Sequence, residues 1–275
     1  MPELPEVETV KNGIKQILGL GDKKNLAIVG VDIRRKNLRE PFPRNLEKNL
    51  IGQDLLDIHR RAKYLLFQFS QGYLINHLGM TGSWRRLESK RFEKHDHFAL
   101  SFASGVVLVF NDPRRFGLVT WSKKLEDYSR LAMLGPEPLS DDFSAEHLLE
   151  ALKGRNGSVK AMLMSQNIVV GIGNIYASEV LFRAGVRPQR PGARVTRAEC
   201  EKIVVESKKV LAEAISAGGS TISDFRQAGG ESGYFQHNFM VYGRSGEACL
   251  RCRTAIKGIM LAGRNSFFCS FCQQR

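Results

Sequence analysis

Four cysteines near the end of the sequence constrain the fold more than any other feature. They form a C-x2-C-x16-C-x2-C pattern, within the usual spacing of a zinc ribbon: Cys249, Cys252, Cys269 and Cys272. Two C-x2-C turns offer four thiolates to one tetrahedral ion, so the pattern predicts one structural zinc ion. Four protein ligands leave no coordination position for water, and we expect no catalytic metal. Disulfides are the alternative, but the first 25 residues do not resemble an export signal, and thiols inside cells stay reduced.

Charge is distributed unevenly along the 275 residues, whose net charge is +13. Residues 1–150 hold 23 basic and 20 acidic side chains, whereas residues 151–275 hold 18 and 8. A basic second half favours a polyanionic partner, of which nucleic acid is the commonest, although solubility alone is an alternative explanation. Because no apolar run approaches the roughly 18 residues of a membrane span, we expect no membrane partner and a cytoplasmic protein.

The first part of the chain combines one helix with many short strands. We expect a helix that starts at Pro2, carries acidic residues in its first turn and ends at Gly19 and Gly21. Short β runs follow, over residues 26–33, 54–59, 64–69, 73–77, 97–102, 106–110 and 117–121. Seven short strands with close turns predict an antiparallel β-sandwich.

Beyond a linker at 134–139 the hydrophobic period becomes helical. Helices are expected over residues 144–152, 158–166, 174–184 and 196–217, the last of which carries Cys200 as a buried or half-buried thiol. A glycine-rich loop at 227–233 precedes the cysteines. The predicted fold class is therefore α+β and multidomain: an N-terminal antiparallel β-sandwich with flanking helices, a helical domain, and a zinc-ribbon β-hairpin.

The segment M-P-E-L-P-E-V-E-T gives the strongest indication of chemistry. Removal of Met1 leaves Pro2 as a secondary amine at the tip of a helix, and an unprotonated amine can attack an aldehydic carbon to form a Schiff base. The positive end of the helix dipole disfavours a second positive charge there, and Glu3 can shuttle protons beside the amine. If Met1 is retained, Pro2 is an amide and no nucleophile. Taken alone, these residues are explained more simply as a stable helix start.

Five motifs occur together and in order: P-E-L-P-E-V-E-T at 2–9, H-L-G-M at 77–80, N-D-P-R-R-F-G at 111–117, G-I-G-N-I-Y-A at 171–177, and the four cysteines. In this combination the chain resembles the bacterial formamidopyrimidine-DNA glycosylase family over essentially its whole length. The resemblance implies an N-terminal catalytic β-sandwich domain (1–133), a linker and the start of the helical region (134–150), a helix–two-turn–helix DNA-binding domain (151–238) and a zinc finger (239–275).

The resemblance also assigns catalytic roles. Pro2 attacks C1′ of the damaged nucleotide, and Glu3 donates the proton that helps to open the sugar ring, with Glu6 supporting the site. Lys63 lies beside the phosphates of the lesion and takes part in proton transfer, although a lone lysine here is otherwise explained as a solvated strand residue. Arg264, on the hairpin between the cysteine pairs, contacts phosphate and assists the δ-elimination.

DNA contacts are implied for His95, Arg114, Asn156, Asn174, Met80, Phe116 and Tyr242. A base must leave the duplex to be excised, and Met80, Arg114 and Phe116 resemble the three side chains that fill the resulting void. Without the resemblance, Met80 and Phe116 are better explained as core residues, and Asn174 as a helix cap. His95 and His97 are too few for a metal site and are better explained by polar packing.

The sequence therefore predicts a monomeric, nucleoid-associated bacterial repair enzyme that acts on damaged double-stranded DNA. It excises oxidised purines (formamidopyrimidines and 8-oxoguanine) and then cleaves the abasic site. Glu231, in the loop expected to cap the flipped base, stands where some relatives carry lysine, which leaves the lesion preference open. Three alternatives stay open: the sister endonuclease VIII branch, which prefers oxidised pyrimidines, a non-catalytic zinc-ribbon DNA-binding protein, and a metal-dependent nuclease.

Overall fold

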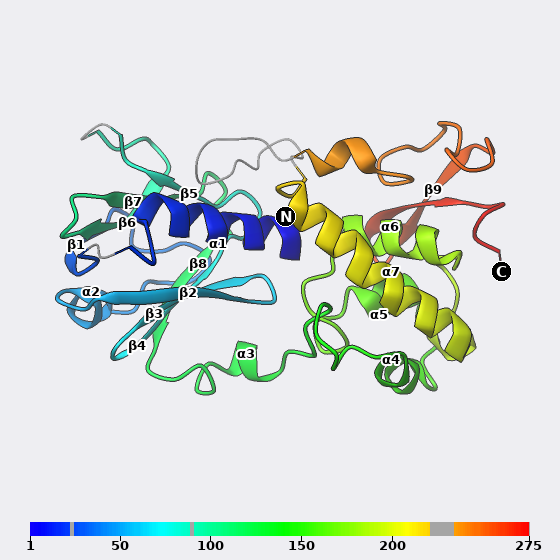
Figure 1. Ribbon diagram of the computed structural model, residues 1–275, viewed down its shortest axis with the longest axis horizontal. Coiled ribbons are helices and arrows are strands. Elements are labelled where there is room, and N and C mark those ends of the chain that lie inside the picture. Colours follow the sequence, from blue (N-terminus) through cyan, green and yellow to red (C-terminus); the bar gives the residue numbers. More distant parts are fainter. Residues whose placement is uncertain (23–24, 89–90, 221–233, 275) are drawn as a thin grey trace. The chain divides into compact units, whose positions relative to one another are not determined.

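The computed structural model describes residues 1–22, 25–88, 91–220 and 234–274. The chain divides into two compact units, each with its own core (Figure 1). Unit 1 comprises residues 1–132 together with 218–234, and unit 2 comprises residues 133–217 together with 235–275. Unit 1 is therefore completed by a segment that follows most of unit 2 in the sequence.

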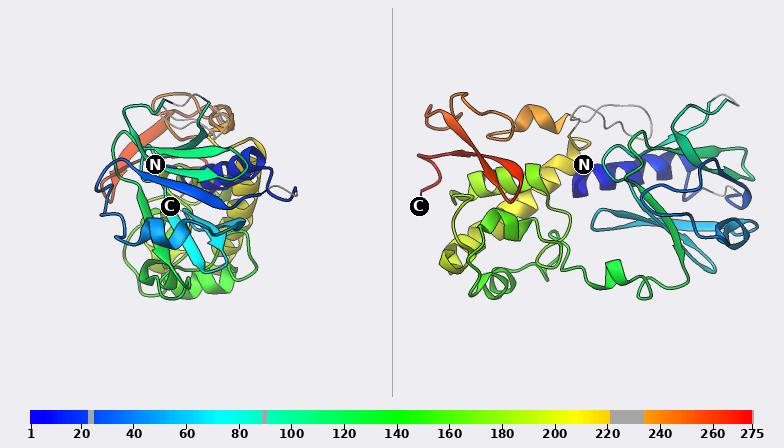
Figure 2. Two further views of the ribbon diagram at one scale, coloured as in Figure 1. Left: turned by 90° about the vertical axis from the view of Figure 1, so that its left-hand side faces the viewer. Right: turned by 180° about the vertical axis from the view of Figure 1, so that it is seen from behind.

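Unit 1 is built on two four-stranded antiparallel sheets, which confirms the predicted sandwich. One sheet has the order β1 (Ile28–Ile33), β6 (Asp96–Phe102), β7 (Val107–Asn111), β5 (Ser83–Arg86). The other has the order β2 (Leu55–Arg61), β3 (Tyr64–Phe69), β4 (Gly72–His77), β8 (Leu118–Ser122). The two sheets form separate layers in Figures 1 and 2. Strand β5 was not predicted, because only Trp84 among its four residues is a buried apolar side chain.

A shared apolar core fixes the N-terminal helix α1 (Leu4–Leu18) onto the sandwich. The helix packs against β2 and β3 of one sheet and β5 of the other. Trp84 is fully buried, with its ring 5.2 Å from those of Phe67 and Phe110, and its indole N–H donates to Asn76 Oδ1 at 2.9 Å. The apolar face of α1 is therefore held at a defined place on unit 1.

The start of α1 differs from the prediction. Glu3, not Pro2, takes the position next to the helix, as its N-cap, and Pro5 lies inside the first turn. The reason is a capping box: the Glu3 carboxylate accepts the backbone N–H of Glu6, so helical conformation starts only at Leu4. Gly19 ends the helix with φ of +59°, as expected for a left-handed cap. Two further short helices lie in unit 1, α2 (Leu46–Leu50) and α3 (Ser129–Ala132).

Unit 2 is helical and ends in a β-hairpin. Its helices are α4 (Ala145–Leu152), α5 (Val159–Leu163), α6 (Asn174–Ala184) and α7 (Arg197–Ser216), with two 3-10 turns, η1 (Gly192–Arg194) and η2 (Phe235–Asn238). The hairpin pairs β9 (Ile256–Leu261) with β10 (Arg264–Cys269). Cys200 is fully buried in α7, and burial raises the pKa of its thiol to about 11. No helix in the described residues is both long and apolar enough to cross a membrane.

Candidate active site

The N-terminal end of α1 holds two buried carboxylates. Glu3 and Glu6 are only 3% and 2% exposed, and Pro2, directly before Glu3, is also buried. Glu6 Oε2 accepts the backbone N–H of Glu3 at 2.9 Å, which completes the capping box. The capping box thus fixes the two carboxyl groups to each other, directly after Pro2 in the chain.

A segment more than 200 residues away in the sequence also binds Glu6. Glu6 Oε1 accepts both the backbone N–H and the hydroxyl of Ser220, each at 2.8 Å. Gly219 makes this approach possible, because its φ is +77° and a Cβ there would lie 3.3 Å from Glu6 Cγ. Ser220 forms an isolated antiparallel bridge with Tyr234, so these two residues lie side by side. Glu231 and the rest of residues 221–233 lie outside the described residues, and the expected capping of the base stays a prediction.

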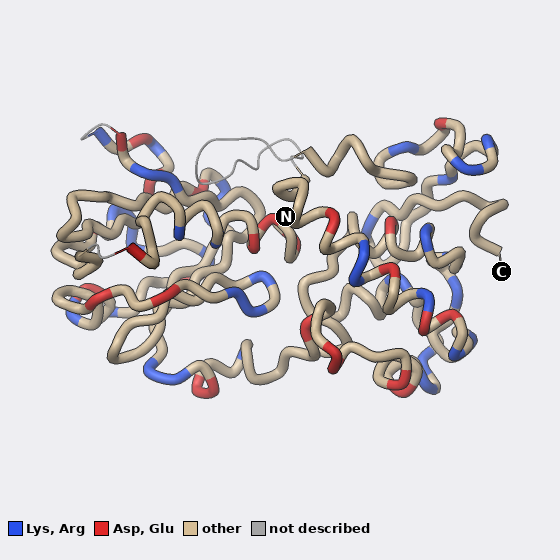
Figure 3. The backbone as a smooth tube through the Cα atoms, viewed as in Figure 1, with Lys and Arg blue, Asp and Glu red and all other residues tan. Residues whose placement is uncertain are grey.

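Lys63 lies in the two-residue turn between β2 and β3, next to Ala62, whose φ is +54°. It is only 6% exposed, so the alternative of a solvated strand residue is wrong. Arg60 orients this turn, since its guanidinium donates to Glu8 Oε2 on α1 at 2.8 Å and to the carbonyl of Ala62 at 3.0 Å. Figure 3 shows the basic turn of β2–β3 in blue and the acidic start of α1 in red. The helix that carries Glu3 thereby fixes the turn that carries Lys63.

The H-L-G-M motif forms the turn after β4. Burial, together with the positive charges of Lys63 and nearby arginines, lowers the pKa of His77 from 6.5 to about 4. The imidazole is therefore neutral at pH 7, and its Nδ1 accepts the backbone N–H of Gly79 at 2.9 Å. This contact orients the turn that carries Met80, and the sequence analysis did not single out His77.

The three predicted void-filling side chains lie on two turns of unit 1. Met80 is half-buried, and Arg114 is exposed with its guanidinium carbon 4.9 Å from the centre of the Phe116 ring. Phe116 is 47% exposed, so its alternative explanation as a core residue is wrong. Exposed aromatic and basic groups on one rigid turn can stack on a base or enter a groove.

His95 lies directly before β6 and is half-buried. Its ring is 6.3 Å from that of the buried His97, and the His97 Nε2 hydrogen-bonds the carbonyl of Asp112 at 3.0 Å. In the described part of the chain, the only group of three or more potential metal ligands is the cysteine cluster. The pair is thus explained by packing, and His95 keeps its predicted DNA contact as a hypothesis.

In unit 2, Asn174 connects the start of α6 to the hairpin. Gly173 is the N-cap, so Asn174 is the first helical residue and its side chain is not the cap. Its Nδ2 donates to the carbonyl of Asn265 at 2.9 Å, and its Oδ1 accepts from Lys160 Nζ at 2.6 Å. Arg264 is the exposed neighbour of Asn265 and begins β10. The contacts of Asn174 therefore place a helix N-terminus beside the strand that carries Arg264, which is an arrangement suited to phosphate.

Lys160 was missed as a functional residue by the sequence analysis. It is 1% exposed, and its ammonium also donates to Ser266 Oγ at 2.7 Å. One buried cation thus links α5, α6 and β10. Only the tertiary structure reveals this linking role of Lys160, because Lys160 and Ser266 are 106 residues apart in the sequence.

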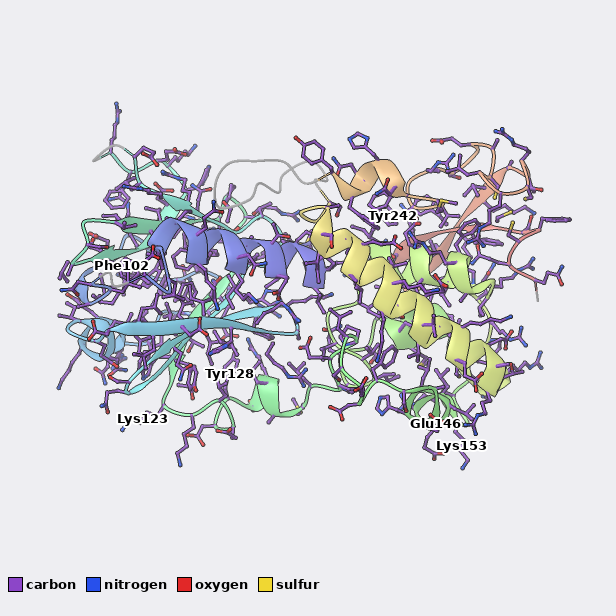
Figure 4. All side chains as sticks on the ribbon, in the orientation of Figure 1. Phe102, Lys123, Tyr128, Glu146, Lys153 and Tyr242 are labelled. Carbon is purple, nitrogen blue, oxygen red and sulfur yellow. The ribbon has the colours of Figure 1, made fainter. Side chains whose placement is uncertain are left out.

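Tyr242 lies between η2 and α6 (Figure 4), with its ring centre 5.6 Å from that of Phe239 and 5.2 Å from that of Phe267. The backbone N–H groups of Met240, Val241 and Tyr242 all donate to the Glu179 carboxylate, at 2.8 to 3.0 Å. Burial raises the pKa of Glu179, and the three donors oppose that rise. The sequence alone gave no signal for Glu179.

The predicted DNA contact Asn156 is exposed, in the loop before α5.

The four cysteines form a cluster that fits one zinc ion. Their sulfur atoms lie within 4.8 Å of one another, with 3.9 Å between Cys249 and Cys272 and 3.4 Å between Cys252 and Cys269. Tetrahedral zinc with Zn–S bonds of about 2.3 Å places its sulfur ligands about 3.8 Å apart. Disulfide sulfurs are separated by only about 2.05 Å, and all the cysteines are free. The donor set therefore fits a structural zinc site and contradicts disulfides.

Comparison with known proteins assigns the whole arrangement to one class. The chain matches the formamidopyrimidine-DNA glycosylase N-terminal domain over residues 1–119, the H2TH domain of the same proteins over 134–226, and a zinc finger found in FPG and IleRS over 246–275. It is 47% identical to the formamidopyrimidine-DNA glycosylase of Bdellovibrio bacteriovorus, over 100% of both chains.

Two solved structures are similar to this chain over essentially its whole length. A mutant of the Lactococcus lactis FPG protein in complex with Fapy-dG containing DNA has a TM-score of 0.88 and 34% identity, with 100% of both chains covered. The Lactococcus lactis Fpg in complex with DNA that contains an abasic site has a TM-score of 0.87 and 34% identity, with 99% and 100% covered. These matches define a protein of the H2TH and zinc-finger class. The chain belongs to the formamidopyrimidine-DNA glycosylase family.

Proposed function

We propose that this protein is a bifunctional base-excision repair enzyme: a glycosylase that excises oxidised purines, formamidopyrimidines and 8-oxoguanine, and a lyase that cleaves the resulting abasic site. The observation that carries the proposal is the capping box of α1, which holds Glu3 buried directly beside Pro2. The names of the relatives and the DNA bound to the solved structures support the substrate class.

In this proposal the Pro2 nitrogen, freed by removal of Met1, attacks C1′ of the flipped nucleotide. The bond from C1′ to the base breaks and its electron pair leaves with the base, which takes up a proton. Glu3 gives a proton to the ring oxygen of the sugar, the ring opens, and C1′ and the proline nitrogen form an iminium ion. The position of Glu3 supports this role, because its buried carboxyl group directly follows Pro2 and is fixed there by the capping box.

The iminium ion then acts as an electron sink for strand cleavage. Loss of a proton from C2′ expels the 3′ phosphate (β-elimination), and loss of a second proton expels the 5′ phosphate (δ-elimination). Lys63 and Arg264 are the residues that we assign to proton transfer and to phosphate contact in these steps. Hydrolysis of the imine releases the sugar remnant from Pro2, and a one-nucleoside gap flanked by two phosphates remains.

The proposal also assigns the residues that bind DNA. His95, Asn156, Asn174 and Tyr242 contact DNA, and Met80, Arg114 and Phe116 fill the space of the flipped base. Zinc held by the four cysteines supplies no chemistry and maintains the hairpin that carries Arg264. The proposed domains are a catalytic domain (1–133), a linker and helix start (134–150), a helix–two-turn–helix domain (151–238) and a zinc finger (239–275). The protein acts as a monomer on double-stranded DNA, in the cytoplasm at the bacterial nucleoid.

Borohydride trapping tests the proposal. The purified protein is incubated with a duplex that carries one 8-oxoguanine opposite cytosine, alongside Pro2→Gly and a variant whose N-terminus is blocked. We expect a covalent adduct with the unmodified protein, a weaker one with Pro2→Gly and none after blocking. Tight binding without base release, also on a formamidopyrimidine duplex, would instead support a DNA-binding module. Preference for an oxidised-pyrimidine duplex would support the endonuclease VIII alternative, and cleavage abolished by brief EDTA exposure would support a metal-dependent nuclease.

A further inference from the structure

Two neighbouring turns of unit 1 carry the three void-filling side chains. The turn 78–82 joins β4 to β5, and the turn 112–117 joins β7 to β8, so each passes from one sheet to the other. The strands on both sides are paired: His77 lies opposite Leu118 in one sheet, and Ser83 lies opposite Asn111 in the other. The two turns therefore run side by side at one end of the sandwich.

The backbones of these turns are in direct contact. A Cβ at Gly79 would lie 2.3 Å from the carbonyl carbon of Phe116, and Gly79 has a φ of +68°. A Cβ at Gly117 would lie 2.8 Å from the ring of Phe110 and 2.9 Å from Asp112 Oδ2. Glycine is required at both positions: a side chain at Gly79 would push the two turns apart, and one at Gly117 would clash with Phe110 and Asp112.

One buried carboxylate and one hydroxyl bond the turns together. Asp112 is fully buried; its Oδ2 accepts the backbone N–H of Gly117 and its Oδ1 accepts the hydroxyl of Thr81, each at 2.7 Å. Thr81 Oγ in turn accepts the backbone N–H of Arg114 at 3.3 Å. Within this arrangement Arg115 has a φ of +57°, a conformation that costs about 1 kcal/mol or more without support.

We propose that Thr81 is a positioning residue that sets the preference for the base opposite the lesion. Its hydroxyl holds Arg114, on one turn, in register with Met80, its neighbour on the other, so that the three side chains act as one rigid group. This inference rests on the proposed function, in which Arg114 fills the space of the flipped base and thereby lies against the base opposite the lesion. Only a hydroxyl both donates to Asp112 and accepts from Arg114 at this position, which makes Thr81→Val the informative substitution.

The test measures the affinity for duplexes that carry a stable tetrahydrofuran abasic analogue opposite cytosine or opposite adenine. Loss of the hydroxyl removes two hydrogen bonds, and we expect Thr81→Val to lower the cytosine-over-adenine preference by about 3- to 10-fold. Thr81→Ser keeps the hydroxyl and should restore the preference to within about twofold. Thr120→Val, a half-buried threonine in β8, is the matched control.

A double substitution separates positioning from simple destabilisation. In an Arg114→Ala background, Thr81→Val should change the preference no further, because the side chain that it positions is gone. An unchanged preference in Thr81→Val, or an equal loss in both backgrounds, would overturn the inference. If Thr81→Val fails to fold, as judged by circular dichroism, Thr81→Ala is compared with Thr81→Ser in the same assay. Base release from 8-oxoguanine duplexes is measured separately, so that absence of catalysis in the unmodified protein counts against the proposed function, while the binding preference still decides the role of Thr81.

Discussion

The carboxylate of Glu6 bonds two distant parts of unit 1, since one oxygen accepts the backbone N–H of Glu3 at 2.9 Å and the other accepts the N–H and hydroxyl of Ser220. Glu3, the residue next to the proposed nucleophile, and Ser220 therefore share one buried carboxyl group. A substitution of Glu6 therefore removes or weakens hydrogen bonds to both Glu3 and Ser220.

Glu6→Gln tests this relationship. An amide presents only one acceptor oxygen, so either the Glu3 N–H or the Ser220 donors lose their partner while staying buried. We expect a loss of about 1–3 kcal/mol in the free energy of unfolding, measured with urea, and a weaker borohydride adduct. Glu47→Gln, at an exposed position of α2, is the control and should leave both values unchanged. Unchanged stability and trapping in Glu6→Gln would contradict a positioning role.

The lowered pKa of His77 predicts a pH dependence of stability. Because the folded pKa is about 4 and the ordinary value is 6.5, the unfolded chain binds the proton more readily between these pH values. The contribution of His77 to the free energy of unfolding is therefore complete above pH 6.5 and is lost as the pH falls toward 4. The loss is no more than about 1.4 kcal/mol per pH unit for one proton. Urea unfolding at several pH values should show a smaller slope in this window for His77→Gln than for the unmodified protein. Equal slopes would show that His77 is not the group responsible.

Removal of zinc should affect unit 2 through the hairpin. We expect one zinc ion per chain, whose chelation exposes four reactive thiols and weakens DNA binding, because β9 and β10 then lose their anchor. Cys200 should stay unreactive toward a thiol reagent, since it is fully buried and its pKa is raised to about 11. Atomic absorption measures the zinc content per chain, and thiol titration before and after chelation counts the reactive cysteines. Chelation that leaves DNA binding intact would contradict the structural role of the metal.

Glu179→Gln should loosen the segment that carries Tyr242. The carboxylate accepts three successive backbone N–H groups, and an amide cannot satisfy all of them. We expect a destabilisation of about 1–3 kcal/mol. We also expect weaker binding of undamaged as well as damaged duplex, because we interpret the proposed DNA contact of Tyr242 as one to the DNA backbone, which both duplexes share. Glu201→Gln, exposed on α7, is the matched control for thermal unfolding and binding. A variant with full stability would show that the three contacts are dispensable.

Local patterns predicted most of the secondary structure. The strand at 64–69 and the helix at 174–184 have the predicted bounds, and glycines stand at both ends of the helix, Gly173 as its N-cap and Gly185 as its C-cap. The short strand at 83–86 escaped prediction because arginines hide its pattern. The helix start was placed wrongly because Pro2 fits a first helical position, whereas the Glu3–Glu6 capping box moves that position to Leu4.

The site was less accessible to sequence reasoning than the fold. The cysteine cluster is fixed by spacing alone, and it forms as predicted. Ser220, Lys160 and Glu179 carry no local signal, because their bonds to Glu6, Ser266 and Met240 span 214, 106 and 61 residues. Such residues are recognised only in the structure, where their burial shows that their polar atoms need hydrogen-bond partners.

The central claim is that the Pro2 nitrogen forms the covalent link to DNA, and the most direct test is to locate that link. The borohydride-reduced complex is digested, and mass spectrometry identifies the peptide that carries the sugar remnant. We predict an N-terminal peptide that lacks Met1 and carries the added mass on Pro2. Added mass on Lys63 or on any other lysine, or an adduct on a chain that retains Met1, would contradict the proposed mechanism.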